Sequence, residues 1–310
     1  MQFRSAIVLP VLAAASVSAE PISDSLSFSR LATLEHIGRI DVNPQTGEIA
    51  VGATGPGFGS AQHVRVVGTD GSVRTIGAAV PDPDSVIWDT GGLFAEPGSV
   101  LVGGVGGLFS VAPTGSTSLL FEAGLDFVNP EDMAFSTANE LLIADYNVGR
   151  VQSLDTQGRF ATVAVSASAV NQVAVSTKTG EILFGDQAGI ASGADESGRL
   201  LSARPNSFIT GLAFGDGSAL WGDDAYGVDR TTGELLRFRG SGFEVIAQGL
   251  FAGFDPSDAT RMPDAAIDFL PTGEMVVAVP TTDTIWTVVP PPASSALLAL
   301  GGLTAMRRRR

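Results

Sequence analysis

The sequence predicts an all-β fold, a six-bladed β-propeller of four-stranded antiparallel blades whose ring is closed by the N-terminal strand. Three observations carry this prediction. Short alternations of apolar and polar residues, ended by Gly, Asn or Asp turn signals, run through the chain as antiparallel strands do. The same pair of strand-like runs recurs six times, at intervals of about 45 residues, the length of a four-stranded blade. The last copy lacks a fourth strand, and residues 25–37 supply an extra strand before the first copy.

The copies can be followed in chain order. Each inner strand is expected at a short apolar run ended by a turn, at IDVNPQTG, SVIWDTGG, DMAFSTAN, QVAVSTKTG, TGLAFGDG and AAIDFLPTG. A second strand is expected after each, at EIAVGA, SVLVGG, ELLIAD, EILFGD, ALWGDD and EMVVAV. Residues 25–37 would complete the last copy and leave no blade-sized open edge. A sandwich would lack this period, and a β-helix would have a much shorter one.

The first 19 residues have the pattern of a secretory signal peptide, and we expect cleavage before Glu20. They carry Arg4, an apolar run at 6–15 and the small residues of a cleavage site at 17–19. A membrane-spanning helix is the alternative. Pro10 interrupts the apolar run, and the run is short of the roughly 20 residues that a span needs.

The C-terminal end has three parts in a fixed order. A proline cluster, an apolar stretch and a basic tail follow one another at Pro290, Pro291, Pro292, residues 293–306, Arg307, Arg308, Arg309 and Arg310. This order resembles the PEP-CTERM sorting signal, with proline at the central Glu position of the family's box. The resemblance implies an exosortase-type processing enzyme as partner, transient membrane contact through the tail, and delivery to the cell surface or extracellular matrix of a bacterium with an outer membrane. A permanent tail anchor is the alternative, although it needs roughly 20 apolar residues.

Three regions follow from these features: a signal peptide at 1–19, the propeller at 20–289 and the sorting signal at 290–310. Removing Arg4 and the four tail arginines from the 18 basic residues leaves 13 against 33 acidic ones, a net charge of −20. Such a charge repels nucleic acid and anionic lipid, so both are excluded as partners. The chain has no cysteine, and its core must therefore hold it together without disulfides. We expect a monomer.

Acidic residues gather at one predicted face of the propeller. In an antiparallel meander, the starts of inner strands and the ends of second strands share a face. The acidic and amide residues placed there are Asp84, Asn129, Glu131, Asp132, Asp145, Asn171, Asp186, Asp223, Asp224 and Asp264. Long connections at 52–62, 222–232 and 249–263 fall on the same face, where binding is expected. Converging carboxylates repel unless a cation intervenes, and Ca²⁺ or another divalent ion suits such oxygen ligands; the alternative is that these residues only cap turns.

The runs PEDMAFSTANELLIADYNVGRVQSLD and RMPDAAIDFLPTGEMVVAV resemble repeats of NHL and gluconolactonase-type propellers, a superfamily that includes regucalcin. The resemblance implies one divalent metal at the channel mouth, held by Asp84, Asn171 and Asp264. Asp84 stands where the family has Glu, and Asn171 is followed by Gln172 rather than Gly. Asp223 and Asp132 are the candidates for the acid/base. The metal would polarise a carbonyl and activate water.

Other chemistry finds little support in the sequence. The two histidines, His36 and His63, fall on outer strands, and no G-x-S-x-G elbow occurs, so a Ser-His-Asp triad is not expected. The tryptophans are expected to pack between blades; alternatively, Trp221 or Tyr226 faces the channel mouth and stacks on a sugar ring. Two functions remain. We favour a non-catalytic binding module that takes a polysaccharide, protein or small molecule on its long-loop face. The alternative is a metal-dependent hydrolase of the lactonase type.

Overall fold

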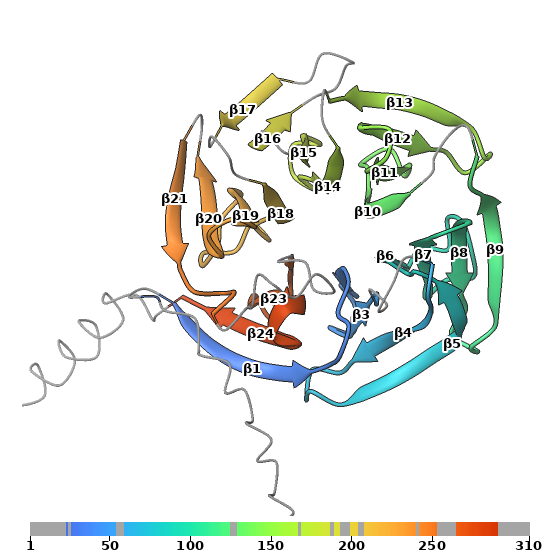
Figure 1. Cartoon of the computed structure of the whole chain (residues 1–310), viewed down its shortest axis with the longest axis horizontal. Coiled ribbons are helices and arrows are strands. Elements are labelled where there is room, and N and C mark those ends of the chain that lie inside the picture. The colour runs from blue at the N-terminus through green and yellow to red at the C-terminus, as the bar shows by residue number, and fades with distance from the viewer. Residues whose placement is uncertain are drawn as a thin grey trace, which may run out of the picture.

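The protein is a β-propeller built from four-stranded antiparallel blades, as the sequence predicts. The computed structural model describes residues 23, 26–53, 59–124, 129–166, 169–186, 189–192, 199–203, 208–239, 242–252 and 265–290. Within these residues the strands form six four-stranded sheets, which Figure 1 shows arranged around a common axis. The helical structure in the same part of the chain is one short 3-10 helix, Pro280–Thr282.

Five sheets are formed by consecutive strands, and in each of them the order along the chain runs from the inner strand outward. They are β2 (Ile40–Val42), β3 (Ile49–Val51), β4 (Ala61–Val67) and β5 (Val73–Pro81); β6 (Ser85–Asp89), β7 (Ser99–Gly104), β8 (Gly107–Val111) and β9 (Thr117–Glu122); β10 (Pro130–Phe135), β11 (Leu141–Asp145), β12 (Arg150–Leu154) and β13 (Phe160–Val165); β14 (Val170–Val175), β15 (Ile182–Asp186), β16 (Gly189–Ser192) and β17 (Arg199–Ala203); β18 (Ile209–Phe214), β19 (Ala225–Asp229), β20 (Glu234–Arg239) and β21 (Gly242–Ala247).

The remaining sheet joins the two ends of the described chain. Its strands are β22 (Ala266–Phe269), β23 (Met275–Val279), β24 (Thr284–Val289) and, on the outside, β1 (Ser27–Thr33). Strand β1 pairs antiparallel with β24, from Ser27 opposite Val289 to Thr33 opposite Thr284. The backbone N–H of Leu34 continues the pairing by donating to the carbonyl of Asp283, at 2.9 Å.

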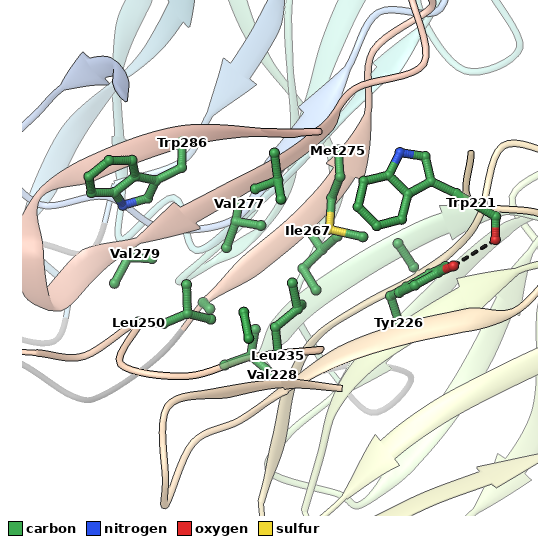
Figure 2. Packing of buried hydrophobic residues seen from close by; sticks show 14 residues of the cluster. Trp221, Tyr226, Val228, Leu235, Leu250, Ile267, Met275, Val277, Val279 and Trp286 are labelled. Carbon is green, nitrogen blue, oxygen red and sulfur yellow. Dashed lines mark hydrogen bonds between the residues drawn. The ribbon is translucent and has the colours of Figure 1, made fainter. Parts of the chain in front are cut away.

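The hydrophobic core lies between neighbouring sheets. In the wedge between the β18–β21 sheet and the β22–β24 sheet, Trp221, Met275 and Trp286 are each at most 2% exposed (Figure 2). Burying such a side chain contributes about 1.5–3 kcal/mol. Trp88 likewise packs with residues of β3, β4 and β7. The expectation that the tryptophans pack between blades is confirmed.

Each pair of successive inner strands is tied by a side chain of one strand bonded to the backbone of the next. Asp41, Asp132, Gln172 and Asp268 accept from the N–H groups of Trp88, Val173, Leu212 and Val42, whereas Ser85 and Thr210 donate to the carbonyls of Pro130 and Ala265. Neighbouring inner strands have no ladder of their own, so these bonds satisfy backbone groups next to the channel. They also fix the height of each inner strand relative to the next.

The predicted second strand ALWGDD is wrong. In the structure, the second strand of that sheet is β19 (Ala225–Asp229), and residues 215–224 connect it to β18. The connection forms turns of its own, with Gly217 N–H bonded to the carbonyl of Gly222 at 2.9 Å. Trp221 is buried against the neighbouring sheet, and its indole N–H donates to the Gly273 carbonyl of that sheet at 2.9 Å. Tertiary burial therefore gave this loop the apolar pattern of a strand.

Candidate functional site: the central channel

The channel holds a cavity of about 610 Å³. Its lining runs from the middle of the inner strands to just beyond their ends, at residues such as Pro44, Thr90, Thr177 and Pro271. The wall surface is polar and apolar in about equal parts, and Ile87, Met133, Leu212 and Ile267 are among the apolar residues that line it. The first residues of β2 and β22, Ile40 and Ala266, line the cavity together with Arg39, which precedes β2, but the first residues of the other four inner strands do not. The cavity therefore belongs to the face opposite the long connections predicted from the sequence.

Arg39 closes the other end of the channel. Its guanidinium Nη1 donates to the Ala265 carbonyl at 2.9 Å and to Thr210 Oγ1 at 3.2 Å. Nε donates to the Glu131 carbonyl at 3.2 Å, and Nη2 lies 3.4 Å from the Asn171 carbonyl. Arg39 is 5% exposed. One side chain thus binds inner strands β10, β14 and β18 and the residue preceding β22.

Three carboxylates stand in the channel wall on the cavity side of Arg39. Asp41 Oδ2 accepts from Trp88 N at 2.7 Å, Asp132 Oδ2 from Val173 N at 3.0 Å, and Asp268 Oδ2 from Val42 N at 2.5 Å. Burial, together with repulsion from Asp268 and Asp132, holds the pKa of Asp41 well above its ordinary value. Burial also raises the pKa of Asp268 to about 6.

Two polar atoms in this wall lack a hydrogen-bond partner among the described residues. Gln172 is 1% exposed, and while its Oε1 accepts from Leu212 N at 3.2 Å, its Nε2 has no partner. Asp41 Oδ1 likewise accepts no hydrogen bond within that part of the chain, since the bonds of Asp41 are all made through Oδ2. A buried amide donor without an acceptor costs about 1–3 kcal/mol. A ligand that supplies an acceptor would recover that cost.

The predicted metal ligands lie at the Arg39 end. The backbone carbonyl of Asp84 accepts from Arg39 N at 3.0 Å, and Asn171 is 3% exposed with an unpartnered Oδ1. Asp264 lies outside the described residues. A guanidinium bonded to the Asn171 carbonyl repels a divalent ion at the same place, so these residues fit such an ion poorly. The described residues contain no group of three or more His, Cys, Asp or Glu that could hold a metal, and the metal site stays a prediction.

The other acidic residues predicted for this face mostly make local bonds. Glu131 Oε1 accepts from Asn129 Nδ2 at 2.8 Å. Asp145 is fully buried, and its Oδ1 accepts from the N–H groups of Asn129 and Asn147, both at 3.2 Å. Asp186 ends β15, and its side chain lies outside the described part of the structure. Asp132 lies in the channel wall, where its carboxylate ties β10 to β14.

Four predicted ligand-face residues lie elsewhere, and these predictions are corrected. Trp221, Asp223 and Asp224 belong to the β18–β19 connection on the opposite face, because the second strand begins only at Ala225. Asp223 pairs with Lys178. Burial opposes ionisation of Asp224, yet its hydrogen bonds to Arg239 and Arg237 lower its pKa.

Tyr226 does not face the channel mouth. It is 1% exposed, and its hydroxyl donates to the Trp221 carbonyl at 2.6 Å (Figure 2). Its ring meets Trp221 edge-to-face, with centroids 5.4 Å apart. Burial raises the pKa of Tyr226 to about 12. Trp221 and Tyr226 therefore stabilise the wedge between two sheets and cannot stack on a sugar from solvent.

Sequence reasoning missed the channel residues Arg39, Asp41, Gln172 and Asp268. A signal was present, since Arg39 directly precedes the predicted inner strand and Asp41 lies two residues later, and such positions share one side of an extended chain. Charged residues at the start of a strand expected next to the axis must either face the channel or be paired. No helix in the described part of the chain is long and apolar enough to cross a membrane.

Comparison with known proteins shows the fold but no family. No protein-family model and no curated protein sequence matches the chain. A gluconolactonase from Xanthomonas campestris superimposes with a TM-score of 0.65 at 12% identity, covering 86% of this chain and 90% of the other. A glucose dehydrogenase gives 0.60 at 14% identity, covering 86% and 100%. Virginiamycin B lyase from Staphylococcus aureus, in complex with quinupristin, gives 0.59 at 12% identity, covering 85% and 99%.

These structures share the propeller architecture, of the gluconolactonase and virginiamycin B lyase type. At identities of 10–14% the similarity extends to the fold alone. The activity of each relative belongs to that relative, because the same propeller carries unrelated functions at different sites.

Proposed function

We propose that this protein is an exported, surface-sorted propeller that binds a small molecule in its central channel without catalysing a reaction. The observation that carries the proposal is the cavity of about 610 Å³ with one end closed by Arg39. Small-molecule sites are mostly apolar cavities of about 300–1,000 Å³ with a few polar groups. We therefore propose the channel as the binding site, instead of the long-loop face that the sequence predicted. A cavity of this size favours a small molecule over a polysaccharide or protein.

The proposal includes a ring of six blades closed by the N-terminal strand. The antiparallel pairing of β1 with β24 supports it, as do the side-chain ties between every pair of successive inner strands. Closure of this kind removes the exposed edges of the first and last blades. A monomer remains the expected state.

Export and sorting rest on the two ends of the sequence, which lie outside the described residues except for Pro290. We propose cleavage after residue 19, recognition of the tail by an exosortase-type enzyme, and delivery to the surface of a bacterium with an outer membrane. Cell fractionation tests this. Replacing Arg307, Arg308, Arg309 and Arg310 by Gln should redistribute the protein among the fractions, and an unchanged distribution would contradict the sorting role.

A lactonase-type hydrolase is the second candidate, and the shared fold of the gluconolactonase supports it. It would use Asp84, Asn171 and Asp264 to hold Ca²⁺ or another divalent ion, with Asp132 or Asp223 as acid/base. The ion pair of Asp223 with Lys178, on the opposite face, speaks against Asp223 in that role. The Arg39 guanidinium next to Asn171 speaks against the ion.

The two candidates separate in one thermal-melting experiment on the mature protein. Binding to the folded state raises the melting temperature. We expect ligands from a small-molecule panel to raise the melting temperature in the presence of EDTA. We expect Ca²⁺, added to the metal-stripped protein without EDTA, to leave the melting temperature unchanged. A Ca²⁺ shift that Asp264→Ala abolishes, together with lactone hydrolysis, would instead establish the hydrolase.

A matched pair of variants locates the binding site. Thr177 lines the cavity rim and is exposed, whereas Thr137 occupies the equivalent turn after β10 but does not line the cavity. Thr177→Trp should weaken every ligand of the channel at least tenfold, and Thr137→Trp should have no effect. Equal behaviour of the two variants would place the site elsewhere.

A further inference from the structure

The ligand class of the channel can be read from the groups that its wall offers. We infer that the cavity binds a small organic cation that also carries an oxygen acceptor, the chemistry of an amino alcohol. This inference rests on the proposed binding function and deepens it. Two independent features carry it: a set of carboxylates of which one oxygen is unused, and the unpartnered Gln172 amide beside them.

Asp41 and Asp268 are the first feature. They occupy neighbouring inner strands, and Oδ2 of each accepts a hydrogen bond from a backbone N–H of the next strand. Asp268 Oδ1 lies 2.7 Å from Phe269 N, while Asp41 Oδ1 has no donor among the described residues. A carboxylate pair of this kind is best completed by a ligand that carries a positive charge.

The electrostatics of the wall point the same way. Burial and the charges of Asp268 and Asp132 raise the pKa of Asp41, so its ionised form is held at a cost. A cation between Asp41 and Asp268 offsets that repulsion and lowers both pKa values. Arg39 and Asp216 also line the cavity. The Arg39 guanidinium donates to carbonyls at the closed end and not to Asp41 or Asp268. A bound cation would therefore still be stabilised by these two carboxylates.

Gln172 is the second feature. Its Oε1 is fixed by the N–H of Leu212, which leaves the amide nitrogen as the free donor of a side chain that is 1% exposed. Asp132 makes the equivalent bond one inner strand earlier, so both side chains leave their strands on the channel side. The Gln172 donor calls for an oxygen acceptor, which a bare ammonium ion lacks.

The walls favour an organic ion over a metal ion. Ile87, Met133, Leu212 and Ile267 line the cavity, and the described acidic residues form no group able to hold a metal. A hydrated metal ion gains nothing from apolar walls, whereas the carbon skeleton of an organic cation loses unfavourable contact with water there. Phe135 and Phe214 also belong to the lining, and aromatic rings attract organic cations.

Calorimetric titration of the mature protein with three probes tests the inference. Choline carries both the charge and the oxygen, 3,3-dimethylbutan-1-ol is its neutral counterpart, and tetramethylammonium lacks the oxygen. We expect choline to bind at least tenfold more tightly than the neutral alcohol and several-fold more tightly than tetramethylammonium. Choline binding should also release protons, seen as an enthalpy that depends on the ionisation heat of the buffer.

Variants assign the contacts. Asp41→Asn combined with Asp268→Asn should weaken choline at least tenfold and leave the neutral alcohol unchanged, with Asp155→Asn, in an exposed turn, as control. Gln172→Met removes the amide donor without adding a charge, so it should abolish the advantage of choline over tetramethylammonium.

Each outcome decides the matter. Equal binding of choline and the neutral alcohol, or choline binding that survives the double variant, overturns the cation inference. If other small molecules still bind in a Thr177-dependent way, the proposed binding function stands without it. If nothing in either panel binds, both fall.

Discussion

The two halves of the channel treat charge in opposite ways. At the closed half, one guanidinium is bonded to carbonyls at the starts of several inner strands. In the open half, carboxylates accept N–H groups from neighbouring inner strands. Asp41 of β2 and Arg39, which directly precedes that strand, are two residues apart and yet belong to different halves. Neighbouring inner strands form no hydrogen-bond ladder with one another, so side chains satisfy their backbone groups. Arg39 donates to carbonyls at one level of the channel, and the carboxylates accept from N–H groups at the other.

The closed half of the channel stabilises the fold, whereas the open half has polar atoms available to a ligand. Arg39 donates hydrogen bonds to the protein itself, at residues of β10, β14 and β18. Asp41 and Gln172 keep one polar atom each without a partner among the described residues. The closed half is therefore expected to govern stability, and the open half binding and pH response.

Removing the Arg39 guanidinium should have the largest effect. Arg39→Met removes the donor to the carbonyls of Glu131 and Asn171, and at about 1–3 kcal/mol for each unpaired group we expect a loss of about 2–6 kcal/mol in the free energy of unfolding. Urea unfolding measures it. If Arg39→Met fails to fold, Arg39→Lys gives the answer, because it retains the charge without the planar fork and should lose part of that stability. Arg159→Met, at an exposed ion pair, is the control; equal losses would refute the role of Arg39 as a tie.

Asp268 should give the open half a distinctive pH response. Its folded-state pKa of about 6 lies above its ordinary value of 3.8. The stability it contributes is therefore fully present below about pH 4 and is lost as the pH rises through 6, by at most about 3 kcal/mol. Asp268→Asn keeps an acceptor for Val42 N and removes this loss.

Urea unfolding at pH 4 and pH 7.5 checks the prediction. Wild type should lose stability relative to Asp268→Asn on going to the higher pH. A difference that does not depend on pH would mean that the carboxyl is not buried as described.

Thr210 should show a smaller effect in the closed half. Its hydroxyl accepts from Arg39 Nη1 and from Ala265 N, and it donates to the Ala265 carbonyl. Thr210→Val keeps the shape and removes these bonds, at a cost of about 1–2 kcal/mol. Thermal melting of Thr210→Val beside the exposed variant Thr177→Val checks this. If Arg39→Met and Thr210→Val act on the same network, their combined loss should be less than the sum.

Asp223→Asn, on the surface around the channel rim, should have the smallest effect on stability. Asp223 pairs with Lys178 through side chains that are 45% and 67% exposed. Asp223→Asn should change the free energy of unfolding by less than about 0.5 kcal/mol and leave lactone hydrolysis, if any is found, unaffected. A large loss of either would restore Asp223 to the candidate site.

The sequence was informative where the local pattern and the tertiary contacts agree. The alternation and turn signals of residues 141–160 reappear as β11, β12 and the start of β13. The pattern failed at residues 215–224, where Trp221 is apolar because it packs against the next sheet. That error moved Asp223 and Asp224 to the wrong face. Trp221 and Tyr226 were open to two interpretations, which only their burial separates.

By itself, the sequence determined the propeller, the length of its blades and the export signals that we propose, because period, turns and terminal signals are local properties of the chain. The tertiary structure alone decided which charged residues meet at the axis. Gln172 and Asp268 lie far along the sequence from Arg39 and Asp41, and only the arrangement of the inner strands brings them together. Spacing within one strand fixes which side a residue faces, but not what lies across the channel.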